Sequence, residues 1–91
     1  ITKIITAANY SLETLNKSVS SYYKKDINEA NENIDRVEKL EKLCEEAKSP
    51  VLKQEPIVSL SLGYILESIG RIGEYAEDIS ETVINHLVGK D

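Results

Sequence analysis

The sequence lacks several residue types that most globular domains contain. It has no methionine, tryptophan or phenylalanine, and its only aromatic residues are five tyrosines. Four glycines and two prolines among 91 residues exclude collagenous and low-complexity chains. The interior must therefore be filled by isoleucine, leucine, valine and alanine. This length and composition predict one small domain and exclude a two-domain enzyme.

Cysteine and histidine are also scarce. Cys44 is the only cysteine, so it cannot form an internal disulfide, and we expect a small buried residue in a reducing, cytoplasmic environment. His86 is the only histidine, and no serine or cysteine stands at a triad-like position beside it. It is typical of a surface histidine rather than a catalytic one. We expect no enzymatic activity.

Basic residues and long apolar runs are few. The 11 basic and 16 acidic residues give a formal charge of −5, which disfavours direct binding of nucleic acid or anionic lipid. No apolar run approaches the roughly 20 residues of a membrane span, and no basic-then-apolar leader is present. We expect no membrane insertion. Because the chain begins at Ile1 and has no methionine, we expect a piece of a longer protein.

Apolar periodicity predicts three helices, over about residues 2–24, 27–47 and 57–88. On the first helix, apolar residues recur at alternating spacings of four and three, and we expect this stripe to form its buried seam: Ile1, Ile5, Ala8, Leu12, Leu15, Val19 and Tyr22. Asp26 followed by Glu29 predicts a capping box at the start of the second helix. The expected buried side of that helix is Ile27, Ala30, Ile34, Val37, Leu40, Leu43, Cys44 and Ala47.

Two prolines predict an irregular connection. Proline inside a helix removes a backbone hydrogen bond and crowds the preceding turn, so we expect the second helix to end before Ser49 and Pro50. The third helix has the most regular seam, and Gly89 is its expected stop: Val58, Leu62, Ile65, Ile69, Ile72, Ala76, Ile79, Val83 and Leu87. Short links between helices with one seam each predict an all-α, antiparallel three-helix bundle.

Three glycines interrupt the third helix at positions 63, 70 and 73. Each costs about 1 kcal/mol relative to alanine inside a helix, so a compensating contact is expected. Gly70 and Gly73 flank the seam, where a missing side chain allows another backbone to approach. These glycines have two alternative explanations, tight packing within the bundle or a docking groove for a partner helix.

A row of mostly acidic residues lies opposite the seam of the third helix: Glu67, Arg71, Glu74, Asp78, Glu81 and Asn85. Glu74 and Asp78 are one turn apart, so their carboxylates can approach a shared divalent or iron cation. Glu67 and Glu81 would extend the oxygen ligands along the same face. The alternative is a solvated face, in which Arg71 forms ion pairs with Glu67 and Glu74.

The run from Gly70 to Glu81, GRIGEYAEDISE, resembles the characteristic motif of PhoU domains, the regulators of phosphate uptake. Residues Arg71, Ile72, Gly73, Ala76, Ile79 and Glu81 match this motif, and Glu74 replaces an acid of the same charge. Gly70, Tyr75 and Asp78 differ from it. The second helix is also similar to the family pattern between Asn28 and Leu40.

This resemblance implies a non-enzymatic cytoplasmic adaptor that represses phosphate-starvation signalling through contacts with a phosphate transporter and its sensor kinase. It also implies a metal-associated pair at Glu74 and Asp78, and either a second three-helix repeat or a homo-oligomer. Related domains are joined to AbrB-like DNA-binding domains or to potassium-transport regulators. A second hypothesis is a dimerisation or regulatory module of a transcription factor or of a potassium-transport regulator. Its third helix would self-associate through Gly70, Gly73 and the exposed end beyond Tyr75, with Arg71 also at the interface.

Overall fold

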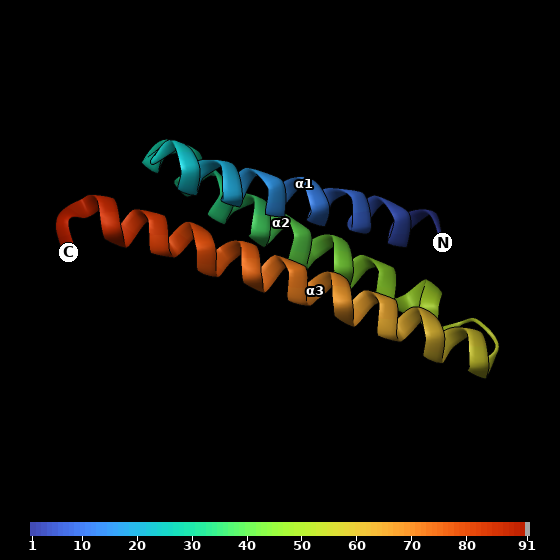
Figure 1. Ribbon diagram of the computed structural model, residues 1–91. Helices are drawn as coiled ribbons and strands as arrows, with labels where there is room; N and C mark the ends of the chain where they lie inside the picture. The colour runs from blue at the N-terminus through green and yellow to red at the C-terminus, as the bar shows by residue number, and fades with distance from the viewer. Residues whose placement is uncertain (91) are drawn as a thin grey trace.

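The computed structural model describes residues 1–90, and the side chains of residues 1–88. Helix α1 spans Thr2–Lys24, α2 spans Ile27–Leu52 and α3 spans Pro56–Asn85, and a π-helical turn follows at His86–Lys90. The three helices pack against one another in a rod of 51 × 18 × 17 Å. In Figure 1, α1 and α3 run in the same direction, and α2 runs antiparallel to both. The predicted antiparallel three-helix bundle is confirmed.

The link between α1 and α2 is as short as the sequence predicts. Lys25 takes a left-handed conformation with φ 55° and ψ 44°, which ends α1. Asp26 then caps α2, because its side chain accepts a hydrogen bond from the Glu29 backbone N–H at 3.0 Å. The Glu29 carboxylate accepts from the Ser20 hydroxyl at 3.3 Å, which ties the start of α2 to α1.

The predicted end of α2 is wrong, because this helix continues through Pro50 to Leu52. Proline has no N–H, so the carbonyl of Glu46 loses its helical partner. Glu46 is exposed, and water can satisfy that carbonyl. Val51 lies one residue further on and is buried in the core, which holds the last turn in place. The predicted loop is consequently reduced to residues 53–55, and α3 begins at Pro56, where a missing N–H costs nothing. The α-helical part of α3 ends at Asn85, three residues before the predicted end.

The predicted seam of α1 is also wrong. The structure instead buries a neighbouring stripe made largely of small residues: Ile4, Ala7, Ser11, Thr14, Ser18 and Ser21. Their hydroxyl groups donate to carbonyl oxygens of α1 itself, as Ser11 does to Ala8 and Ser18 to Leu15, both at 2.7 Å. These hydroxyls therefore need no partner on another helix. Small side chains let the helices approach closely, so this stripe is buried in place of the larger residues beside it.

The cores of α2 and α3 agree better with the sequence. Ala30, Val37, Leu40 and Ala47 are buried on α2, and Ile69, Ala76 and Val83 are buried on α3, as predicted. Val58, Ile65 and Leu87 of the predicted α3 seam are instead exposed. Among residues 1–90, no helix combines the length and the hydropathy that crossing a bilayer requires.

Candidate functional site

The acidic row of α3 lies on the surface. Glu67, Glu74, Asp78 and Glu81 are all exposed. Arg71 interrupts the row, and its Nη2 lies 3.4 Å from Oε2 of Glu67. Both of these side chains are exposed, so this pair adds little to stability.

The two carboxylates of the predicted metal pair border different hollows. Glu74 lines the groove between α2 and α3, whereas Asp78 lines a hollow that also contains Val19 and Tyr22 of α1. Within the described part of the chain, no three His, Cys, Asp or Glu side chains lie close enough together to hold a metal ion. One chain therefore does not bring Glu67, Glu74, Asp78 and Glu81 together as a complete ligand set.

Glu77 is an acidic residue that the sequence analysis did not single out. It is only partly exposed, and its pKa is raised, first by burial and then by the negative charges of Glu81, Glu41, Asp78 and Glu74. Glu74, Asp78 and Glu81 belong to α3, so helical spacing alone places them near Glu77. Glu41 belongs to α2, so its proximity depends on how the two helices pack.

The three glycines of α3 have different surroundings. A Cβ atom added at Gly73 would lie 2.8 Å from Cδ2 of Leu40, so this glycine makes room for a fully buried leucine of α2. Gly73 is thus a packing residue inside the bundle. A Cβ atom at Gly63 or Gly70 would meet nothing within 4 Å. The absence of side chains at these two positions leaves open space on the surface.

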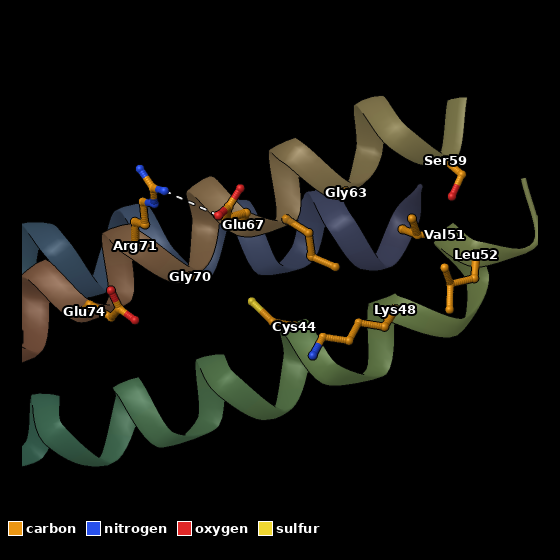
Figure 2. Close-up of a pocket in the computed structure, with 11 residues that line it drawn as sticks. Cys44, Lys48, Val51, Leu52, Ser59, Gly63, Glu67, Gly70, Arg71 and Glu74 are labelled. Carbon is orange, nitrogen blue, oxygen red and sulfur yellow. Dashed lines mark hydrogen bonds and ion pairs between the residues drawn. The ribbon is translucent and has the colours of Figure 1, made fainter. Parts of the chain in front are cut away.

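This open space is a groove of about 590 Å³ between α2 and α3, shown in Figure 2. One side carries Cys44 and Lys48 of α2, and the other carries Gly63, Gly70 and Arg71 of α3. A smaller hollow of about 240 Å³ borders Cys44, Gly70 and Glu74 as well, and extends the groove toward Leu40 and Gly73. The groove therefore follows the two helices for several turns.

The single cysteine and the single histidine have different surroundings. Burial raises the pKa of the Cys44 thiol, Lys48 lowers it by a smaller amount, and Glu41 raises it further. The reactive thiolate is thereby disfavoured. His86 lies in a hollow with Tyr22, Tyr23 and Thr82, and the Thr82 hydroxyl already donates to the Asp78 carbonyl oxygen at 2.8 Å.

Comparison with known protein families identifies the bundle. The family model of the PhoU domain matches residues 4–83, from the first buried residue of α1, Ile4, to the last of α3, Val83. Neither the curated proteins nor the solved structures yield a match to this chain. The resemblance read from residues 70–81 is confirmed by a match that covers most of the sequence. The chain belongs to the PhoU domain family.

Proposed function

We propose that this chain is a regulatory adaptor of the cytoplasm that acts in phosphate-uptake signalling by contacting other proteins. The observation that carries the proposal is the PhoU match over residues 4–83, which spans the whole packed part of the bundle. The partners implied by the family resemblance are a phosphate transporter and its sensor kinase. The domain acts by binding rather than by catalysis.

The surface that suits such a contact is the groove between α2 and α3. Gly63 and Gly70 leave it open, Val51 and Leu66 contribute buried apolar surface, and Arg71 and Lys48 supply charges at its edges. An apolar floor with charged edges is typical of protein-binding grooves. The groove contains two of the predicted interface residues, Gly70 and Arg71.

The experiment is complementation in a host that lacks its own copy of the gene. Deletion of the host's own gene is expected to raise expression of phosphate-starvation genes under phosphate-replete conditions. Expression of the natural protein in this host is expected to restore repression. Gly70→Arg fills the groove with a side chain that the bundle itself tolerates, because a Cβ there meets nothing within 4 Å. This variant is expected to fold normally and to fail in repression.

The matched control is Asn31→Arg, which adds the same side chain at an exposed position of α2 that does not line the groove. It is expected to repress as the natural protein does. Unchanged expression after deletion would contradict the proposed function. Full repression by Gly70→Arg would contradict the choice of the groove while leaving the adaptor role in place.

We also propose that Glu74 and Asp78 bind a divalent or iron cation, with Glu67 or Glu81 as a further ligand. Because one chain does not gather three such side chains among its described residues, water or a partner protein would have to complete the coordination. Calorimetric titration with Fe²⁺, Zn²⁺ and Mg²⁺ tests it. Binding that is lost in Glu74→Gln and kept in the control Glu46→Gln would support the site, and no binding under saturating metal would contradict it.

A further inference from the structure

The groove between α2 and α3 is uncharged at the end nearest the loop of residues 53–55. The residues that line it there include Val51 and Leu52 of α2 and Ser59 of α3, and Figure 2 shows these three at one end of the groove. Leu52 is 77% exposed, although it lines the groove beside buried Val51. This end therefore offers hydrocarbon that a second molecule would remove from water.

The charges along the middle of the groove are paired within their own helices. On α2, Nζ of Lys48 lies 3.0 Å from Oε1 of Glu45. On α3, Nη2 of Arg71 lies 3.4 Å from Oε2 of Glu67. Each pair combines one positive and one negative charge, so the middle of the groove favours neither sign in a bound molecule.

The opposite end of the groove is acidic. Glu41 of α2 and Glu74 of α3 line the smaller hollow that extends the groove. Glu77 lies seven residues after Gly70, so it continues the same side of α3. Both Glu41 and Glu74 contribute to the raised pKa of Glu77. No ion pair between the described side chains involves Glu41, Glu74 or Glu77, so the described part of the chain does not neutralise this charge.

The groove has the length and the open positions that suit a docked helix. Gly63 and Glu77 are fourteen residues apart, which is about 21 Å or four turns along α3. Gly63 and Gly70 lie two turns apart, and a Cβ atom at either position would meet nothing within 4 Å. Helices packed side by side approach each other at such seven-residue intervals. An extended segment would instead need a sheet edge to bond its backbone, and both walls of the groove are helices.

We propose that this groove binds an amphipathic helix of a partner protein, with aliphatic side chains at one end and lysine or arginine at the other. The aliphatic side chains lie against Leu52 and over Gly63 and Gly70, where they leave water. The basic side chain lies between Glu41 and Glu77, where it neutralises charge from both walls of the groove. This inference rests on the proposed adaptor role and specifies the chemistry of its partner.

The test begins with selection of binders to the purified chain from a displayed library of helical peptides. Each peptide has about 18 residues, or five turns, with leucine and alanine at four-and-three spacing and random residues in the first and last turns. We expect each selected sequence to be basic in one terminal turn and apolar in the other. General attraction to a chain of charge −5 would instead enrich lysine and arginine in both turns. That result would overturn the proposal, and so would the absence of any binder.

Substitutions then test the position of the basic side chain. Glu41→Gln and Glu77→Gln are each expected to weaken binding of a selected peptide about 10-fold, measured by fluorescence anisotropy at low salt. The control is Glu46→Gln, which removes the same charge from an exposed position of α2 that does not line the groove. Its affinity should match that of the natural chain. Equal affinity in all three variants would overturn the proposal.

Cys44 reports whether the peptide occupies the groove. It is the only cysteine and lines the groove, so saturating peptide is expected to slow its alkylation at least about 10-fold. An unchanged alkylation rate would overturn the proposal. These assays on the purified chain do not depend on phosphate signalling. Failed complementation with intact peptide binding would therefore contradict the proposed function alone, and successful complementation without peptide binding would contradict this inference alone.

Discussion

Asn33 of α2 donates through Nδ2 to the Ser80 hydroxyl of α3 at 3.1 Å and to the Thr14 carbonyl oxygen of α1 at 3.0 Å. One buried amide thus joins all three helices at the same level of the bundle. Because the surrounding core side chains are small, they fix the axial position of each helix only weakly. A buried polar contact of this kind sets the register of packed helices.

Asn33→Ala removes both cross-helix hydrogen bonds, so the Thr14 carbonyl oxygen and the Ser80 hydroxyl lose their donor on α2. We expect the free energy of unfolding to fall by about 1–3 kcal/mol, measured by urea denaturation. The control is Asn31→Ala, which makes the same change at an exposed position of the same helix. It should alter stability by less than about 0.5 kcal/mol. Equal stability of the two variants would show that the buried amide has no such role.

Gly70→Ala and Gly73→Ala form a matched pair on α3. Both gain the helix propensity of alanine, about 1 kcal/mol. Only Gly73→Ala brings a Cβ within 2.8 Å of Leu40. We therefore expect Gly70→Ala to be more stable than the natural protein, and Gly73→Ala to be less stable than Gly70→Ala by about 1–3 kcal/mol. Thermal unfolding followed by circular dichroism measures this difference, and the reverse order would contradict the packing role of Gly73.

Glu77→Gln should stabilise the protein in a pH-dependent way. The pKa of Glu77 is raised in the fold by burial and by neighbouring carboxylates, so its ionised form opposes folding. This penalty is present above the raised pKa and disappears as pH falls through it. The gain in melting temperature from Glu77→Gln should therefore be larger at neutral than at acidic pH. Glu46→Gln, at an exposed position of α2 outside this cluster, should show no such pH-dependent gain.

Arg36→Lys tests the contact between α1 and α2. The Arg36 guanidinium lies 4.2 Å from the Tyr10 ring centroid, and its Nε donates to the Thr14 hydroxyl at 3.3 Å. Lysine keeps the charge but loses the planar stacking and this donor geometry. We expect a loss of about 1 kcal/mol in urea denaturation. An equal loss in Lys39→Arg, whose side chain lies 5.5 Å from the same ring, would contradict a specific role of Arg36.

Periodicity predicts the number and order of the helices because apolar residues recur clearly enough to mark each one. It fails for the buried side of α1, because two stripes lie next to each other and the larger residues of the outer stripe dominate the pattern. Hydroxyl groups that bond to their own helix, such as those of Ser11 and Ser18, can be buried at little cost. Sequence patterns that count only apolar residues do not register them.

The sequence also predicts one part of the candidate site and not another. The exposure of Glu74 and Asp78 follows from their spacing relative to the core of α3. The contact of Gly73 with Leu40 and the proximity of Glu77 to Glu41 depend on the axial register of α2 against α3. That register arises from packing between helices, which periodicity within one helix does not contain.

The hydroxyl-rich inner side of α1 has a consequence for how the bundle opens. The free energy gained by removing hydrocarbon from water is small for this helix, since only Ile4 and Ala7 are buried apolar residues on it. Helices α2 and α3 carry every buried leucine and valine of the core, and Ile69 as well. We expect the first helix to detach before the other two separate, so that its amide protons exchange with deuterium earliest and the α2–α3 hairpin is the last native element to unfold.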